Sequence, residues 1–351
     1  EICACLVGSE MCIRDRLMIV AGVLVAIKFI QGNKIKQTQT SAGVEENKEP
    51  EKEVIKLPTT FAGKDRPIAV MIDNNINAMP QAGLLEADLV YEIIVEGGET
   101  RMMAVLKGKD VEKIGPVRSS RHYFLDYALE NDAIYVHFGW SPQAESDIST
   151  MGVNNINGLY YDGSYFWRVS EKYAPHNAVI STKNILKVAE NNEYRTTSEQ
   201  KPVLNYVADE IELEDGKEAE TITIPYSDYN TVKYTYNEDK KEYVRYSRGK
   251  KQVDWNTDTT ITTKNIIVTF AENYSLNDGS GKGRQGLENI GKLKGYYITN
   301  GKAIEITCEK TSRTTQTVYK DLQGNEIKVN DGKTFIQICP CLLYTSDAAD
   351  E

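Results

Sequence analysis

The sequence predicts an α/β fold in its first half and a β-rich fold in its second half. From 58 to 200, apolar runs typical of strands alternate with segments of helical spacing. From 201 to 340, short runs of tyrosine and β-branched residues are separated by turn residues such as "NEDK", "NG" and "QGN". We therefore expect an N-terminal α/β layered domain at 58–200 and a smaller antiparallel β-rich domain at 201–340, in the α+β or α/β class.

The first half contains both kinds of regular element. Tyr123 and Tyr127 lie four residues apart behind two serines, which predicts a helix with a serine as its N-cap, starting at Ser119 or just before it. The predicted helices cover 119–132, 141–152 and 181–192, and the predicted strands cover 66–73, 88–98, 100–108 and 133–140.

The second half is predicted to be a meander of hairpins. Its predicted strands and hairpins cover 221–227, 231–250, 264–274, 295–310, 315–329 and 333–339. The stretch "TSEQKP" at 197–202 is the expected domain boundary.

Both ends of the chain look foreign to the fold. Residues 1–16 and 341–351 read like translated library adaptors, and we expect them to be adaptor-derived artefacts. These two segments hold six acidic and two basic residues, so the rest of the chain has a net charge near −6 instead of −10. A mildly acidic balance gives no overall attraction to nucleic acid, and no nucleic-acid partner is expected.

The segment after the first of these ends indicates export. Residues 17–30 begin with an uninterrupted apolar run that stops at Lys28, which is short for a membrane span and typical of a truncated signal or anchor segment. Residues 31–57 are polar, charged and poor in aromatics, as in a disordered tether. We expect an extracytoplasmic protein that this N-terminal segment anchors to the cytoplasmic membrane.

Only two cysteines lie between the end segments. Cys308 and Cys339 are far apart and show no C-x-x-C spacing, so neither a metal site nor a cofactor is predicted. A disulfide between them would suit an exported protein, whereas two separate buried thiols are the simpler expectation.

Several long motifs resemble those of a known family. "RPIAVMIDNN", "KIGPVRSSRHYF", "YVHFGWSPQA" and "APHNAVIS" in the first half, with "GKGRQ", "GYYITNGKAI" and "KTFIQICP" in the second, are similar to the YerB-like family of Gram-positive extracytoplasmic lipoproteins, over roughly residues 57 to 340. The resemblance implies a two-part domain of unknown function and an envelope location, and it supplies no catalytic residues. One feature departs from the family: no cysteine that could accept a lipid follows the apolar run before Cys308.

The stretch "KIGPVRSSRHYF" at 113–124 carries two arginines that need an explanation in an acidic chain. Arg118 and Arg121 lie three residues apart at an expected helix start, where free backbone N–H groups and guanidinium groups would together bind a carboxylate or phosphate. Alternatively, both arginines form buried ion pairs with Asp73, Glu92, Glu96 or Glu99. The sequence leaves these two hypotheses open.

Further polar residues are expected at the same edge of the fold. Because ligands of open α/β sheets bind beyond the carboxyl ends of strands, we expect the polar residues there to form a crevice of mixed charge. The predicted ligand-binding residues are Arg118, Arg121, Arg101, Asn74, Glu96, His137, Arg168, His176 and Asn177. Such a crevice suits an anionic or zwitterionic ligand, such as a cell-wall fragment, or an envelope protein of wall synthesis.

Catalysis is an alternative function for the same residues. His137 or His176 could act as a general base that Asp73 or Glu96 orients, with Ser119 or Ser120 as the nucleophile, which would make the protein a hydrolase or transferase. The sequence lacks a G-x-S-x-G elbow and an H-E-x-x-H motif, so binding is favoured. A third alternative is an interaction scaffold in which the arginines are structural.

The glycine-rich stretch "NDGSGKGRQG" at 277–286 also carries positive charge. Its glycine spacing differs from that of a phosphate-binding loop, and it lies among predicted hairpins, so a hairpin loop is expected. Lys282 and Arg284 in this loop could contact an anionic partner.

Overall fold

The computed structural model describes residues 56–340, and these belong to one compact unit. The expectations for 1–16, 17–30 and 341–351, and nearly all of the predicted tether at 31–57, lie outside the described residues. Within the described range, no helix is long and apolar enough to cross a membrane.

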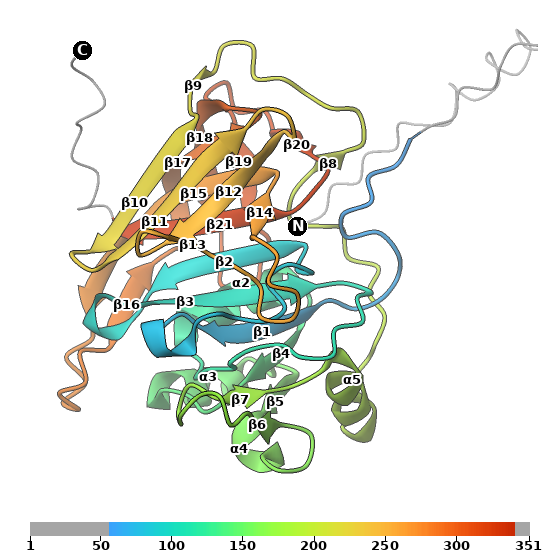
Figure 1. The fold of residues 1–351 in the computed structure, drawn as a ribbon, viewed down its shortest axis with the longest axis vertical. Helices are drawn as coiled ribbons and strands as arrows, with labels where there is room; N and C mark the ends of the chain where they lie inside the picture. The colour runs from blue at the N-terminus through green and yellow to red at the C-terminus, as the bar shows by residue number, and fades with distance from the viewer. Residues whose placement is uncertain (1–55, 341–351) are drawn as a thin grey trace, which may run out of the picture. The chain divides into compact units, whose positions relative to one another are not determined.

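A long mixed sheet forms the middle of the fold (Figure 1). Its strands, in spatial order, are β19 (Val318–Lys320), β18 (Lys302–Lys310), β17 (Gly291–Thr299), β15 (Asn265–Ser275), β21 (Thr334–Pro340), β2 (Leu89–Ile94), β3 (Thr100–Leu106), β1 (Ile68–Asp73), β4 (Ile134–His137) and β5 (Asn155–Asn157). Two short strands pair with it off this path, β16 (Gln285–Glu288) with β15 and β9 (Lys217–Glu218) with β18.

The last described strand joins the two halves of the chain. β21 lies between β15 and β2 and runs parallel to both, so that Leu89 of the first half and Asn265 of the second each pair with Thr334. The long sheet is therefore continuous across both halves. The sheet does not divide near residue 200. Whether the two halves fold as separate domains, as the sequence predicts, therefore stays a prediction.

A smaller antiparallel sheet covers part of the long one. It consists of β10 (Thr221–Ser227), β11 (Asn230–Asn237), β12 (Glu242–Ser247), β13 (Lys250–Lys251) and β14 (Thr262–Thr263). Two further pairs are β6 (Trp167–Arg168) with β7 (Ala178–Val179) and β8 (Tyr206–Val207) with β20 (Val329–Asn330).

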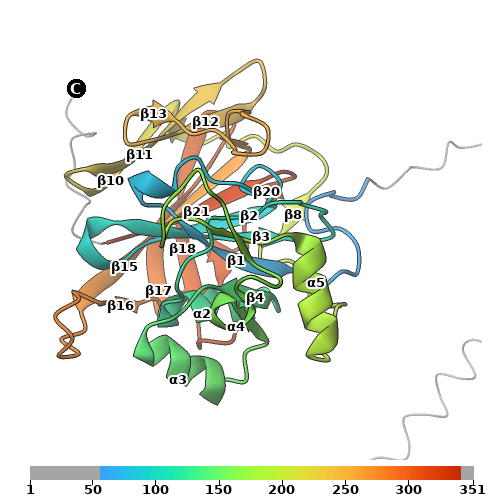
Figure 2. The same cartoon turned by 60° about the horizontal axis from the view of Figure 1, so that its bottom comes forward.

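The helices of the described range all come from the first half. They are α2 (His122–Glu130), α3 (Pro142–Thr150), α4 (Gly158–Tyr161) and α5 (Thr182–Asn191), together with the short 3-10 helices η1 (Ile76–Ala78) and η2 (Glu96–Gly98). Figure 2 shows α2 and α3 on one side of the long sheet and the smaller sheet on the other.

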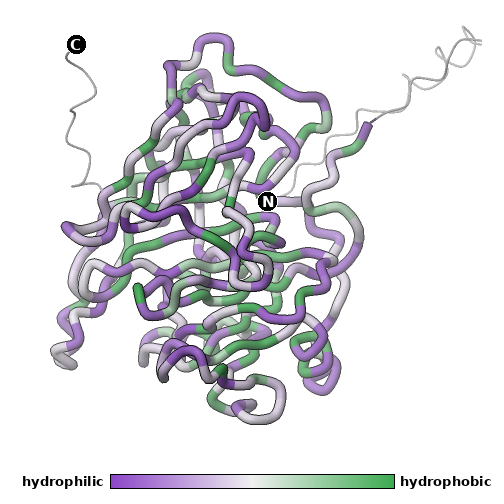
Figure 3. Tube along the Cα trace, in the orientation of Figure 1, coloured by the Kyte–Doolittle hydropathy of each residue, from purple (hydrophilic) through white to green (hydrophobic). Residues whose placement is uncertain are grey.

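The two hydrophobic cores follow from strand alternation. In β3, Met103 and Val105 point to the core that contains α2, whereas Met102 and Ala104 point to the core beneath the smaller sheet. Figure 3 shows hydrophobic residues concentrated along the strands of the long sheet. Because both faces are covered, β2 and β3 are buried along their whole length.

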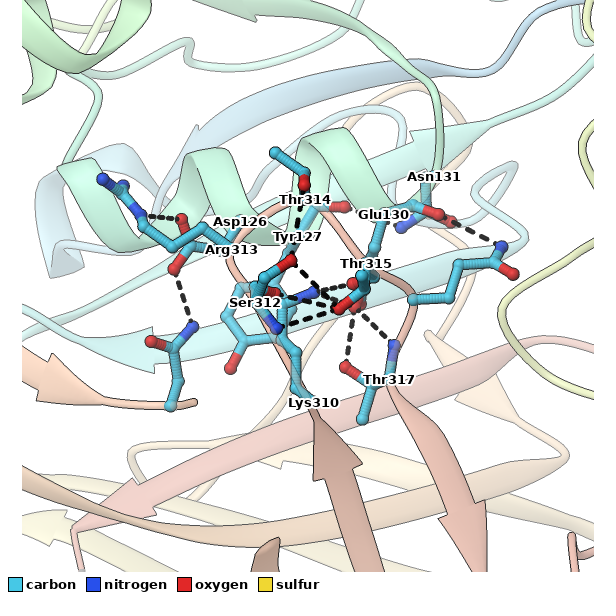
Figure 4. Close-up of polar contacts among 12 residues, drawn as sticks. Asp126, Tyr127, Glu130, Asn131, Lys310, Ser312, Arg313, Thr314, Thr315 and Thr317 are labelled. Atoms are coloured by element: carbon cyan, nitrogen blue, oxygen red, sulfur yellow. Dashed lines mark hydrogen bonds and ion pairs between the residues drawn. The ribbon is translucent and has the colours of Figure 1, made fainter. Parts of the chain in front are cut away.

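Two buried ion pairs connect the halves of the chain. Arg245 of β12 contacts Glu92 of β2 with 2.6 Å between Nη2 and Oε2, and both side chains are fully buried. Lys310, at the end of β18, contacts Glu130 of α2 at 2.7 Å. Figure 4 shows how the loop after Lys310 reaches α2 and how Thr317 also donates to Glu130.

The predicted elements are found, but their balance differs from the prediction. The expected helices and strands of the first half are present near their predicted positions. The described chain is nevertheless mostly strand with few helices, so the α/β layering holds only in part. Parallel pairing of β21 with β15 was also not expected in the second half, because pairing of distant strands leaves no local sequence signal.

Cys308 and Cys339 are both buried and are not joined to each other, so the alternative of a disulfide between them is wrong for this structure. Cys308 Sγ lies 3.2 Å from Thr269 Oγ1, and burial raises the pKa of the Cys308 thiol to about 12. Cys308 is therefore an uncharged residue of the core.

Candidate functional site

A polar cleft of about 410 Å³ opens at one edge of the long sheet; we call it the cationic cleft. Its lining residues are Asp73, Asn75, Val95, Glu96, Glu99, Thr100, Arg101, Arg118, Ser119, Arg121, Trp140, Ser141, His176, Lys282 and Arg284.

Strand ends place the first set of these residues. Asp73 is the last residue of β1, and Glu96 lies just after the end of β2. β3 runs in the opposite direction and begins at this edge, so Arg101 pairs with Asp73 in the register of the sheet. The sequence prediction of a polar edge beyond the carboxyl ends of strands therefore matches the placement of these residues.

The stretch before α2 brings in the two arginines. The backbone N–H of Arg118 donates to the Met71 carbonyl of β1 at 2.9 Å, which fixes this segment beside the strand. α2 begins at His122 with Arg121 as its N-cap, and no side chain caps it.

The predicted serine cap of this helix is wrong, because other groups engage both serines. Ser119 donates to the Phe138 carbonyl at 3.0 Å. Ser120 accepts from the Tyr135 hydroxyl at 2.8 Å. Both serines therefore tie the segment to the end of β4 and the residues after it instead of capping α2.

Arg121 is engaged with Glu96 through two contacts. Its Nε lies 2.5 Å from Oε1 and its Nη2 lies 3.0 Å from Oε2, while Nη1 donates to the Ser120 carbonyl. Arg101 supports the same carboxylate from 3.7 Å and donates to the Ser119 carbonyl at 2.6 Å. Most guanidinium donors of Arg121 are therefore already used within the protein.

Arg118 is held more loosely. Its Nε lies 3.2 Å from Asp73 Oδ2, and the same oxygen lies 2.7 Å from Nδ1 of His176. The Arg118 side chain is 26% exposed, compared with 12% for Arg121. No hydrogen bond joins its two Nη groups to another described residue, so these donors face the cleft free of protein partners.

The charges of this edge stabilise one another. Burial acts to raise the pKa of Asp73, but the hydrogen bond from His176 and the charge of Arg118 leave it below its ordinary value. Burial likewise opposes the ionisation of Glu96, yet Arg121 and then Arg101 lower the pKa of Glu96. Burial and the charge of Arg121 lower the pKa of Arg101 to about 10, which still leaves it protonated at neutral pH.

The second half contributes two more cations. Lys282 and Arg284 lie in the loop between β15 and β16 and line the cleft, where Arg284 is paired with Asp278. Five cationic side chains thus face three carboxylates among the lining residues, an excess of two positive charges. Two further side chains pair with lining residues: Asp278 with Arg284, and Arg248 with Glu99. They add one negative and one positive charge, so the excess is unchanged.

His137, a predicted site residue, lies outside the cleft. It is fully buried, with Nδ1 2.8 Å from the Gly139 carbonyl and Nε2 3.1 Å from Asn155 Oδ1. Burial lowers the pKa of His137 to about 4, so its ring is neutral at neutral pH. The structure therefore places His137 away from the cleft, and its role as a ligand-binding residue or general base stays a prediction that its burial disfavours.

Three further predicted residues also lie elsewhere. Asn74 is fully buried, does not line the cleft and donates to Glu92 at 3.0 Å. Arg168 donates to Asn177 at 2.8 Å, and neither of these two residues lines the cleft. Each of the three is engaged in a hydrogen bond within the protein.

Sequence reasoning missed two lining residues with chemical interest. Trp140 and Ser141 lie at the end of the predicted strand 133–140 and directly after it, and the polar-edge argument could have included them. Ser141 is the N-cap of α3 and accepts from the Ala144 N–H at 3.3 Å. The starts of α2 and α3 therefore both border the cleft, which adds to its positive potential.

The arrangement is suited to anion recognition. Asp73 and Glu96 hold the arginines in place, and the excess charge leaves an attraction for a negative group. His176 and Asp73 also form a base with an orienting carboxylate, but Ser119 donates to Phe138 and not to His176. The described residues contain no cluster of histidine, cysteine and carboxylate side chains that could hold a metal ion.

Comparison with known proteins identifies the class of protein. Residues 57–195 match the family model described as "Protein of unknown function (DUF3048) N-terminal domain", and residues 222–336 match the model of the DUF3048 C-terminal domain. The chain belongs to this DUF3048 family, the YerB-like family whose motifs the sequence resembles.

A bacterial relative and its crystal structure support this assignment. The chain is 33% identical over 297 residues to the protein named "Putative lipoprotein YerB" of Bacillus subtilis (strain 168), covering 82% of this chain and 85% of the relative. It is also similar to the crystal structure of the YerB protein from Bacillus subtilis, with a TM-score of 0.73 and 31% identity. That match covers 81% of this chain and 97% of the crystallised one.

Proposed function

We propose that the protein is a membrane-tethered extracytoplasmic protein of the cell envelope that binds an anionic group in the cationic cleft. The observation that carries this proposal is the excess of two positive charges in a cleft of about 410 Å³ at the edge of the long sheet. The cleft size lies within the range of about 300–1,000 Å³ that small-ligand sites occupy. A zwitterionic ligand would also fit, because Glu99 lines the same cleft.

Arg118 and Lys282 are the residues that would contact the ligand. Arg118 keeps its Nη groups available, and Lys282 has no ion-pair partner among the described residues. Arg121 and Arg101 would instead supply a fixed positive field, since they are occupied by Glu96 and by backbone carbonyls. Each of the two hypotheses therefore applies to one of the arginines. Arg121 acts as an ion-pair residue, and Arg118 acts as a recognition residue.

The envelope location rests on the sequence and on similarity. The apolar run at 17–30 and the polar segment at 31–57 suit an anchor followed by a tether. The Bacillus subtilis relative carries the name "Putative lipoprotein YerB", which supports the same location for this chain. Cell-wall fragments and envelope proteins of wall synthesis are therefore the proposed partners.

Thermal unfolding of the purified protein with a panel of anions tests the proposal. Inorganic phosphate, phosphorylated sugars, wall peptides and neutral sugars would each be titrated against the wild type and Arg118→Ala. We expect at least one anionic compound to raise the unfolding temperature of the wild type and to lose this effect in Arg118→Ala. If no anion stabilises the wild type, the proposed binding function is wrong.

A hydrolase or transferase is the second candidate, and one observation favours it. His176 Nδ1 lies 2.7 Å from Asp73 Oδ2 inside the cleft, as in a general base held by a carboxylate. His137 suits this role less well, because it is buried and both of its ring nitrogens are hydrogen-bonded within the protein. Turnover of a wall fragment that His176→Gln abolishes without weakening its binding would support this candidate.

A further inference from the structure

We propose that the ligand of the cationic cleft is a phosphorylated sugar, whose ring packs on Trp140 and Tyr160. This inference rests on the proposed function and adds the chemical class of the ligand. Two features of the cleft carry it: the size of the charge excess, and aromatic side chains that continue from the cleft onto the surface.

The charge excess favours phosphate over carboxylate. A phosphate monoester carries about −1.5 to −2 charges at neutral pH and offers three acceptor oxygens, whereas a carboxylate carries one charge. The cleft has two positive charges in excess, together with free donors on Arg118 and Lys282. A phosphate group would neutralise this excess and could accept from both side chains.

The aromatic side chains lie beside these charges. Trp140 lines the cleft, and its ring packs against the buried His137 with 5.4 Å between the ring centroids. The ring of Tyr160 in α4 meets Trp140 edge to face at 6.1 Å, and Tyr160 is 71% exposed. Leu159 beside it is 57% exposed, so α4 presents an apolar surface next to the cleft.

The exposed ring of Tyr160 and the partly buried ring of Trp140 match the chemistry of a sugar ring. One face of a sugar ring carries C–H groups and can cover an aromatic surface, while its hydroxyl groups need hydrogen-bond partners. Three lining residues carry hydroxyl groups, but Ser119 already donates to the Phe138 carbonyl and Thr100 to Glu92, which leaves the hydroxyl group of Ser141. Ser141 accepts from the Ala144 N–H, and its own O–H remains able to donate.

Inorganic phosphate alone would not explain the aromatic surface. A small dianion needs only the cations and the helix starts, and it would leave Tyr160 and the accessible part of Trp140 uncovered. A ligand that carries a ring next to its phosphate would cover both. The cleft volume of about 410 Å³ accommodates a monosaccharide phosphate, and Trp140 is among the residues that line it.

Isothermal titration calorimetry on the full chain tests this inference. The probes are N-acetylglucosamine 1-phosphate, N-acetylglucosamine, inorganic phosphate and adenosine 5′-monophosphate. The variants are Tyr160→Ala and Trp140→Leu, with Leu322→Ala as a control for loss of an exposed apolar side chain, since Leu322 is 64% exposed and lies outside the cleft lining.

We expect the sugar phosphate to bind at least about tenfold more tightly than inorganic phosphate. Tyr160→Ala and Trp140→Leu should weaken its binding about three- to tenfold and leave inorganic phosphate unchanged, whereas Leu322→Ala should change neither. Because Tyr160 is largely exposed, its replacement tests the ring contact even if Trp140→Leu disturbs the fold.

Three results would overturn the inference. Equal binding of the sugar phosphate and inorganic phosphate would leave anion binding intact and remove the sugar. Tighter binding of adenosine 5′-monophosphate would assign the aromatic surface to a nucleobase. Absence of binding by every phosphate would contradict the proposed function as well.

Discussion

Arg121 contacts both carboxylate oxygens of Glu96, with Nε 2.5 Å from Oε1 and Nη2 3.0 Å from Oε2. Two parallel contacts of this kind fix both side chains and leave little of the guanidinium for a ligand. Arg118, three residues earlier, makes one contact to Asp73 and keeps its other donors free. The two arginines of one short motif therefore differ in how firmly the protein holds them, and we propose different roles for them.

This difference predicts unequal effects on stability. Arg121→Ala should lower the free energy of unfolding by about 3 kcal/mol, because the partly buried Glu96 carboxylate loses its main partner. Arg118→Ala should lower it by about 1 kcal/mol or less, because Asp73 keeps His176. Urea denaturation measures both, with the exposed Lys187→Ala on α5 as a control. Equal losses would contradict the division of roles.

Stability should depend on the protonation of His137. Burial lowers its pKa from 6.5 to about 4, so between these values the unfolded chain binds more protons than the folded protein. The stabilisation is present above about pH 6.5 and is lost as the pH falls toward 4, with a total of about 3 kcal/mol.

His137→Gln removes this titration and should flatten the pH dependence over the same interval, whatever its effect on stability at pH 7. His122 is still present in this variant, and burial also lowers its pKa to about 4. The contribution of His122 to the pH dependence of stability should therefore remain. Unfolding free energies measured from pH 7 to pH 4 provide the readout. An unchanged slope in His137→Gln would show that His137 does not titrate as the structure indicates.

The buried pair of Glu92 and Arg245 should stabilise the contact between the two sheets. Arg245→Met leaves the Glu92 carboxylate buried without a cation, and we expect a loss of about 3–5 kcal/mol. Glu92→Gln combined with Arg245→Met should recover part of this loss, because the amide oxygen of the new side chain can still accept from Asn74 and Thr100. A double-mutant cycle measures the coupling, and strictly additive losses would argue against the pair.

The shared sheet predicts that the two halves fold together. In a fragment that ends near residue 200, β2 would lack β21 and Glu130 would lack Lys310. We expect such a fragment to give a poorly dispersed NMR spectrum, and the whole protein to unfold in one cooperative transition. A well-dispersed, cooperatively unfolding fragment would support the domain boundary predicted from the sequence.

Local patterns in the sequence predicted much of the first half. The apolar runs around β1 to β4 and the helical spacing of Tyr123 and Tyr127 are local signals, and strands and helices occur where they indicate them. The place of β21 between β15 and β2 depends on contacts between distant segments, and no local pattern encodes it. The same limit applies to the start of α2, where tertiary hydrogen bonds draw both serines away from the cap position.

The candidate site was predictable to a similar extent. Asp73, Glu96 and Arg101 could be placed together because strand ends meet at one edge of a sheet. His137 sits at a strand end as well, but its side chain points into the protein, which the sequence pattern does not reveal. Lys282 comes from the other half of the chain, and its place in the cleft lining depends on the path of the hairpin between β15 and β16. No local sequence pattern predicts that path.

Calorimetric titration with inorganic phosphate at low salt is the decisive test of anion binding in the cationic cleft. It compares the wild type, the double variant Arg118→Gln and Lys282→Gln, and Lys187→Gln as a control. We expect saturable binding by the wild type and by the control, weakened at least about tenfold in the double variant, because both free donors of the cleft are then uncharged. Equal affinity in the double variant, or no binding by the wild type, would contradict it.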